Sequence, residues 1–345
     1  MSVAAPVRPP TGVRVRAAAP WALPAAVLLV AAAVVASLKV GARPLAWAEL
    51  HAGLLHFSGT QSDIVVRHIR LPRTIAGLLT GTCLGLAGAV AQGVTRNPLA
   101  GPGTLGVNAG AAGAMIAVIA LTGVGSLSGY VWFGFLGGAL AAAAVYAIGG
   151  SGRDGATPVK LALAGAAVSA LIMAMTSAFV LLDRELFARY RYWVIGSLAR
   201  ADLVTVGQAV PFAVAGVLLA VVLVRRLDAV ALGDDTARSL GARPGVTRVT
   251  GLVAVVVLAG TATAVAGPVA FVGLVAPHAA RLLVGTAHRW VLPLSALLCA
   301  AVVLLADVAG RVVLAPEEIQ IGVTAALLGG PVFLYLVRTR KVAAL

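Results

Sequence analysis

The feature that most constrains this chain is a succession of apolar segments, separated by stretches that hold most of its charge. Each segment is close to the roughly 20 residues that a helix needs to cross a bilayer. Only 11% of the residues are charged, against about a quarter in soluble domains, so we expect an all-α polytopic membrane protein with about ten transmembrane helices. The expected spans are residues 21–38, 74–93, 105–121, 131–148, 159–182, 204–224, 249–266, 271–284, 292–306 and 321–337.

The lysines and arginines between these segments indicate the orientation. With the N-terminus inside, about 16 of them fall on the inner side and about 10 on the outer side, and cytoplasmic loops are usually the richer ones. We therefore expect both termini in the cytoplasm. The net charge of +14 belongs to these loops and forms no basic face, so nucleic acid is not an expected partner. The predicted organisation is a basic tail (1–19), one ten-helix membrane domain (20–340) and a short cytoplasmic tail (341–345).

The residue pattern argues against several kinds of chemistry. Cys83 and Cys299 lie inside apolar segments without CxxC spacing, so we expect no disulfide and no metal site. No lysine stands in a GxxxxGK[ST] loop, so the chain has no phosphate-binding loop of its own. The acidic residues map to loops, with Asp307 at the outer end of a span, whereas an ion-coupled carrier needs acids within the membrane. No nucleophile and base are paired, so we expect a pathway that another subunit energises, not an enzyme.

The longest charged stretch of the second half, residues 225–248, exceeds what a turn between two helices requires. Gly233 is a suitable helix stop, and Asp234 or Asp235 is a suitable N-cap for a second short helix. That helix would carry Ala237 and Leu240 on one side with Arg238 beside them, and Gly241 would end it. Two interpretations stay open: a soluble partner grips this element, or it is an amphipathic turn that covers lipid headgroups.

A second basic cluster lies on the outer side, in the stretch IVVRHIRLPR before the second span. Arg67, Arg70 and Arg73 have no equal number of acids near them in the sequence. They are either solvated loop charges or a docking patch for an acidic partner. The glycines at 77, 81, 85 and 88 of the following span predict a helix that its neighbours approach closely, at the centre of the bundle.

Seven stretches together resemble the permease subunits of the iron–siderophore, haem and cobalamin ABC importers, the FecCD-like type II importers. Their combination, order and spacing make the resemblance specific, and it covers residues 69 to 340. The stretches are IRLPR (69–73), GLAGAVAQGVTRNPLAGPGTLGVNAGA (85–111), WVIGSL (193–198), LGDDTARSLG (232–241), AGPVAFVGLVAPHAARLLVG (266–285), LLADVAGR (304–311) and LLGGPVFLYL (327–336).

The resemblance implies a ten-helix type II ABC importer permease fold in a bacterial cell membrane. It implies a second permease subunit, identical or related, two cytoplasmic ATPases that bind ATP and Mg²⁺, and an extracytoplasmic substrate-binding protein; this chain itself would bind no cofactor. Residues 232–241 would be the coupling element, with Leu232, Gly233, Asp234, Ala237, Arg238, Leu240 and Gly241. Arg70, Arg73 and Arg311 would meet carboxylates of the binding protein. Relatives usually have Glu at the position of Asp234 and Pro at that of Gln320.

By the same resemblance, the substrate pathway runs between two permeases and is lined by the fifth and tenth spans. On the fifth span Gly165, Ser169, Met173 and Thr176 share one helical face, and each of them could equally pack against another helix. The expected cargo is a ferric siderophore. The alternatives are cobalamin or haem carried by the same machinery and, from another class, an ion-coupled secondary transporter.

Overall fold

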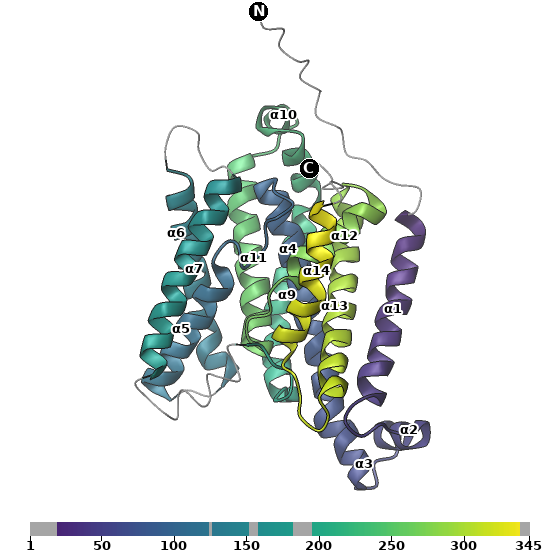
Figure 1. Cartoon of the computed structure of the whole chain (residues 1–345). Coiled ribbons are helices and arrows are strands. Elements are labelled where there is room, and N and C mark those ends of the chain that lie inside the picture. The colour runs from purple at the N-terminus through teal and green to yellow at the C-terminus, as the bar shows by residue number, and fades with distance from the viewer. Residues whose placement is uncertain (1–18, 124–125, 152–157, 182–194, 339–345) are drawn as a thin grey trace, which may run out of the picture.

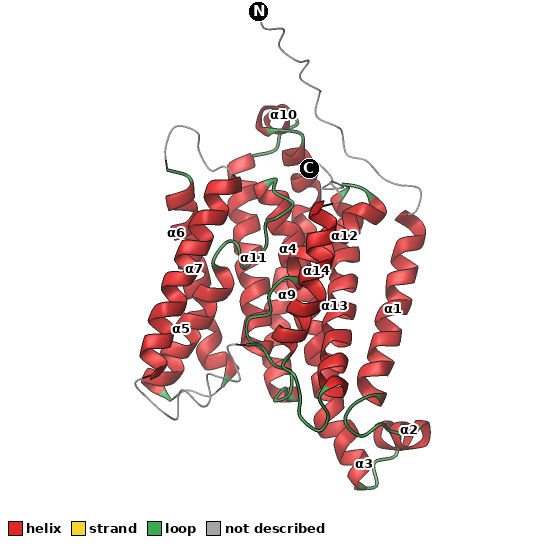
Figure 2. Cartoon of the chain, in the orientation of Figure 1, coloured by secondary structure: helices red, strands yellow, loops and turns green. Residues whose placement is uncertain are grey.

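A computed structural model describes residues 19–123, 126–151, 158–181 and 195–338 (Figure 1). Within these residues the ordered elements are helices, and no strand occurs (Figure 2). Seven helical segments are long and apolar enough to span a membrane, and three apolar helices are shorter, which together account for the ten predicted spans. The ten helices are α1 (Ala19–Lys39), α4 (Leu71–Thr95), α5 (Val107–Thr122), α6 (Leu127–Gly149), α7 (Pro158–Leu181), α9 (Leu203–Ala231), α11 (Pro244–Ala266), α12 (Val272–Val284), α13 (His288–Val313) and α14 (Ile321–Arg338).

Helix α4 lies at the centre of the bundle, as its glycines predicted, and packs against α9, α11, α12 and α13. Gly81 and Gly85 allow close approach, because a Cβ on either would overlap the backbone of α13 at Ala300 or Ser295. Gly88 faces the carbonyl of Gly273 on α12 in the same way. These glycines therefore let the backbones of α4, α12 and α13 approach closely, as small residues do at other helix contacts within lipid.

The outer segment before α4 is more helical than the sequence led us to expect. The stretch up to Arg73 was predicted as a loop, but one continuous helical run covers Gln61–Thr95, with α3 (Gln61–Ile64) and the π-helical turn η1 (Val65–Arg70) leading into α4. Its start is a capping box, in which Thr60 and Asp63 each accept a hydrogen bond from the other's backbone N–H. A further helix, α2 (Trp47–Leu55), lies beside α3 at this end of the bundle, the α2 end (Figure 1).

The predicted coupling segment is also more regular than a loop. Helix α9 continues to Ala231, beyond the predicted boundary at residue 224, and α11 begins at Pro244. Between them stands the short helix α10 (Asp234–Ser239), which projects from the bundle opposite α2 (Figure 1). We refer to this side as the α10 end. The start of α1 and the end of α14 lie at the same end (Figure 1).

Candidate functional site

Helix α10 is positioned by glycines and by one shared carboxylate. Gly233 is its N-cap, with φ 104°, and Gly241 follows it with φ 78°, conformations that favour glycine. The prediction that Asp234 or Asp235 is the N-cap is wrong, because both lie inside the first turn. The Oδ1 atom of Asp234 instead accepts from Nη2 of Arg96 at 2.9 Å and from Nη2 of Arg248 at 2.8 Å.

Asp234 thereby connects three elements. Arg96 is the C-cap of α4, in the left-handed region with φ 50°, and Arg248 belongs to the first turns of α11. The Asp234 side chain is 25% exposed, so these two ion pairs are partly shielded from water. This carboxylate is therefore engaged within the chain and links the projecting helix to two helices of the bundle.

The two apolar residues of the predicted coupling face differ in exposure. Ala237 is fully buried, whereas Leu240 is 63% exposed, so Ala237 does not contribute to an exposed apolar face. Arg238 is exposed and pairs with Asp235 within α10. Leu232, the C-cap of α9, is half-buried and connects the two helices. The surface open to a partner is thus Leu240 with the Asp235–Arg238 pair.

Below α10 the bundle contains a polar layer that the sequence analysis did not identify. Asp228 on α9 accepts from the backbone N–H of His288 at 3.0 Å, and its Oδ1 lies 2.7 Å from Nδ1 of that ring. Arg281 on α12 donates to Oε1 of Gln92 on α4, and Gln92 donates to the carbonyl of Leu274. These contacts connect α9 to α13 and α4 to α12. In the sequence, these contacts are indicated only by single polar residues that stand next to apolar segments.

A groove of about 640 Å³ opens between helices that are distant in the sequence. Its walls come from α5, α7 and α14 together with the segments that precede α5, α9 and α12. None of the lining residues is charged, and the polar ones are amide or hydroxyl side chains. The lining residues are Gly103, Asn108, Ala109, Ala112, Gly113, Ile116, Ser169, Met173, Thr176, Ile195, Pro268, Ala270, Gly322, Val323, Ala326 and Leu327.

Three of the four residues proposed for the pathway line this groove, namely Ser169, Met173 and Thr176 on α7. The fourth, Gly165, does not line it, because it faces the carbonyl oxygen of Thr104 so closely that a Cβ would overlap it. Gly165 is therefore a packing residue. The sequence analysis missed Asn108, although it is the only amide in its apolar span and therefore carried a signal.

At the α2 end, the three arginines predicted to dock a binding protein are buried, so they do not form an exposed patch. The guanidinium of Arg73 contacts both carboxylate oxygens of Asp307, with N–O distances of 2.8–3.0 Å, and donates to Glu318 at 2.8 Å. Arg311 also pairs with Asp307, at 3.1 Å. The acids that pair with Arg73 come from α13 and from the loop before α14, more than 200 residues from Arg73, so the sequence around Arg73 could not reveal them.

Three outer arginines donate to backbone carbonyls, most of which lie at the C-terminal ends of α1 and α2. Arg70 donates to the carbonyls of Leu38 and Arg43, and Arg311 donates to the carbonyl of Ser37. Arg67 donates to the carbonyls of Gly53 and Leu54, near the end of α2. Helix C-termini carry unpaired carbonyls and partial negative charge, so they can satisfy Arg67 and Arg70 without a carboxylate in direct contact. These contacts argue against freely solvated loop charges, and the docking of a binding protein at this end stays a prediction.

The helical bundle, the projecting α10 and the uncharged groove together define a multi-pass membrane transport subunit. The model of the FecCD transport family matches residues 28–339. The chain belongs to this family, and the resemblance drawn from its motifs is confirmed.

Two relatives illustrate this membership. The ferric enterobactin transport system permease protein FepD of Escherichia coli (strain K12) is 43% identical over 323 residues, covering 92% of this chain and 95% of FepD. The Bacillus subtilis (strain 168) protein named "Probable siderophore transport system permease protein YfiZ" is 37% identical over 312 residues, covering 90% of this chain and 94% of YfiZ.

A solved structure supports the fold. A metal-chelate type ABC transporter in an inward-facing conformation superposes with a TM-score of 0.77 at 28% identity, covering 93% of this chain and 99% of that chain. The predicted type II ABC importer permease fold is thereby confirmed.

Proposed function

We propose that this chain is the permease subunit of an ATP-driven importer that moves a ferric siderophore from an extracytoplasmic binding protein into the cytoplasm. The observation that carries the proposal is the groove of about 640 Å³, whose lining contains no charged side chain. A large chelate must enter and leave such a passage, and fixed charge would hold it in place. Walls of small, weakly polar and flexible residues such as Ser169, Thr176 and Met173 suit this purpose.

The groove needs a second wall, which we propose is another permease subunit. Met173 on α7 and Leu327 on α14 line the groove, yet both are largely exposed in the single chain. Leu171 on α7 and Leu328 on α14 are exposed as well. A second copy of the chain, or a related permease, would cover these residues and enclose the passage between two subunits.

The energy is proposed to come from a separate ATPase that binds ATP and Mg²⁺ and contacts the α10 end. This places α10 and both termini in the cytoplasm of a bacterial cell, in agreement with the excess of inner lysines and arginines. The substrate-binding protein would then dock at the α2 end. There the buried arginines would support the docking surface indirectly: Arg311 holds the end of α1, and Arg73 holds the loop before α14.

Uptake assays test this proposal. The chain, its ATPase and its binding protein are reconstituted in liposomes and supplied with ⁵⁵Fe-loaded siderophores, haem or cobalamin. We expect ATP-dependent accumulation of at least one ferric siderophore. Accumulation of cobalamin or haem alone would reassign the cargo within the family. Accumulation by this chain without an ATPase, driven by an ion gradient, would refute the mechanism.

A further inference from the structure

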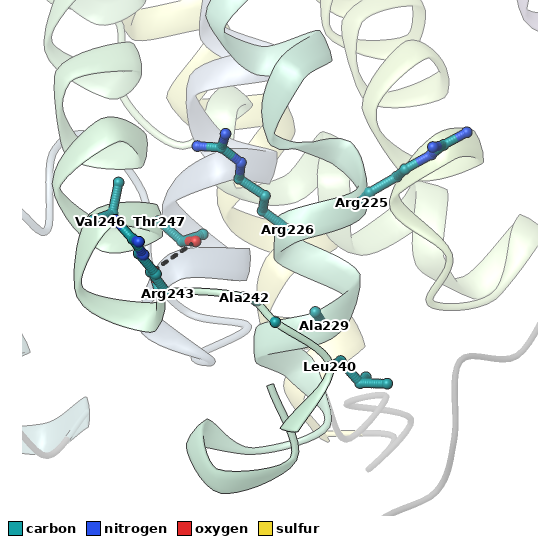
Figure 3. A pocket seen from close by; sticks show the side chains of 9 residues that line it. Arg225, Arg226, Ala229, Leu240, Ala242, Arg243, Val246 and Thr247 are labelled. Atoms are coloured by element: carbon teal, nitrogen blue, oxygen red, sulfur yellow. Dashed lines mark hydrogen bonds between the residues drawn. The ribbon is translucent and has the colours of Figure 1, made fainter. Parts of the chain in front are cut away.

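A second cavity, of about 470 Å³, lies at the α10 end between the last turns of α9 and the start of α11 (Figure 3). Three of its lining residues are arginines and none is acidic. Figure 3 shows Arg226 reaching from α9 toward α11, where Arg243 lies, while Arg225 extends from the other side of α9. We call this cavity the arginine cleft. Its lining residues are Arg225, Arg226, Ala229, Leu240, Gly241, Ala242, Arg243, Val246 and Thr247.

The charges of the arginine cleft differ from the other charges around α10. Arg96 and Arg248 share the carboxylate of Asp234, and Arg238 pairs with Asp235. By contrast, the exposed guanidinium groups of Arg225, Arg226 and Arg243 make no ion pair within the described part of the chain. Asp228, the nearest acid along α9, is engaged with His288. The cleft therefore combines several positive charges, and no acid among residues 19–123, 126–151, 158–181 and 195–338 pairs with them.

The depth of the cleft matches the headgroup layer of a bilayer. The apolar part of α9 runs from Leu203 to Val224, roughly 22 residues or about 33 Å of helix, close to the ~30 Å hydrocarbon core. Arg225 and Arg226 follow directly. One turn toward the membrane from Arg226 lies the exposed Val222, and the exposed Val246 lines the cleft beside Arg243.

We propose that the arginine cleft binds the phosphate group of an anionic phospholipid of the cytoplasmic leaflet. Guanidinium groups donate paired hydrogen bonds to phosphate oxygens, and an anionic headgroup supplies a counterion that the described residues do not. The exposed valines then contact the first methylenes of the acyl chains. A soluble phosphate would match the arginines but would leave this apolar surface in water. The bound lipid would fill the space between α9 and α11, directly under the element that carries Leu240.

Native mass spectrometry of the full-length chain in detergent, titrated with phosphatidylglycerol, tests the proposal. Each basic residue near an anionic membrane surface contributes enough to change affinity by roughly fivefold. Arg226→Gln and Arg243→Gln are therefore each expected to weaken the first phosphatidylglycerol site about fivefold, and the double variant by about thirtyfold. Arg289→Gln is the matched control, because Arg289 is exposed in the first turn of α13, lies on the same side of the membrane and does not line the cleft.

Several results would overturn the proposal. An equal loss of affinity in Arg289→Gln would show that diffuse charge, and no cleft, attracts the lipid. Phosphatidylcholine binding as tight as phosphatidylglycerol would remove the role of the headgroup charge. Complete competition by inorganic phosphate would identify a site for the free ion. If the cleft variants lost assembly with the ATPase in lipid-free detergent but kept phosphatidylglycerol binding, the cleft would belong to a protein partner.

Discussion

Replacement of Asp307 by Asn tests whether the ion-pair cluster at the α2 end holds this part of the bundle together. The Asp307 side chain is 2% exposed and is shared by two guanidinium groups. Arg73 contacts both of its oxygens, and Arg311 approaches Oδ2 at 3.1 Å. Asparagine keeps the shape of the side chain but removes the charge. After the substitution, the ion pair between Arg73 and Glu318 remains, while Arg311 loses the carboxylate with which it pairs.

The expected cost follows from burial. Removing one partner of a buried ion pair costs about 3–5 kcal/mol, because the remaining charge stays in a poorly polarisable environment. The contacts of Arg311 with Ser37 and of Arg73 with Glu318 survive and reduce the loss. We therefore expect Asp307→Asn to lower the free energy of unfolding by about 3 kcal/mol, at the lower end of that range. Glu318→Gln is the control, since Glu318 is 37% exposed, and it should cost no more than about 1 kcal/mol.

Reversible unfolding of the purified chain in mixed micelles with increasing dodecyl sulfate, followed by circular dichroism, gives both values under the same conditions. The reasoning is refuted if Asp307→Asn and Glu318→Gln have the same free energy of unfolding within error. In that case water would screen the cluster and its geometry would contribute little. The same result would remove the basis for assigning Arg73 and Arg311 a structural role.

Three further predictions concern separate elements. Leu240→Asp should change stability by no more than about 0.5 kcal/mol, because Leu240 is exposed, yet abolish ATP-driven uptake; unchanged uptake contradicts a role for this surface. Gly165→Leu should lower the thermal unfolding temperature through overpacking, whereas Ser169→Leu should reduce uptake without that shift; the reverse pattern contradicts the groove assignment. The backbone N–H of Ala46 lowers the pKa of Glu49 below its ordinary 4.5, so this cap stabilises α2 above that pH and is lost as the pH falls through the lowered value; hydrogen exchange in α2 should show this loss, and Glu49→Gln should remove the pH dependence.

The spans could be predicted because the bilayer imposes both a length and a composition, and each of the ten expected segments corresponds to a helix. The errors lie where charge occurs within a helix. The stretch containing Arg67, Arg70 and Arg73 resembles a loop in the sequence, since the carbonyls and carboxylates that satisfy it come from other elements. Asp307 was placed at the end of a span for the same reason. Partners from other elements stabilise these charges within helices, and no local sequence pattern reveals those partners.

The candidate sites divide along the same line. Helical spacing on one segment predicted Ser169, Met173 and Thr176, and these residues share a face of α7. The contribution of α5, through Asn108 and Gly113, depends on how three distant helices meet and could not be predicted. Likewise, glycine chemistry predicted the limits of α10, while the burial of Ala237 depends on how α10 packs against α9 and α11.

The packing around α10 indicates how a movement imposed on it would reach the groove. Of the described helices, α10 packs substantially against α9 and α11, and of these two only α11 also packs substantially against a helix that lines the groove, α5. Asp234 strengthens this route, because its carboxylate holds Arg248 on α11. We therefore expect Asp234→Asn to lower the amount of substrate transported per ATP hydrolysed, while the chain stays folded, since two partly exposed ion pairs contribute about 1–2 kcal/mol in total.

The chain contains a matched control for this change. Asp235 lies one residue further along α10; its side chain is fully exposed, and its ion-pair partner among the described residues is Arg238 of the same helix. Asp235→Asn removes the same charge from the same short helix without detaching α10 from α11. If both variants equally reduced the amount of substrate transported per ATP hydrolysed, the effect would come from the charge of the α10 surface. The ion pairs of Asp234 would then not couple α10 to the bundle. A loss confined to Asp234→Asn, with nucleotide hydrolysis continuing, would show that the projecting helix moves the bundle through this carboxylate.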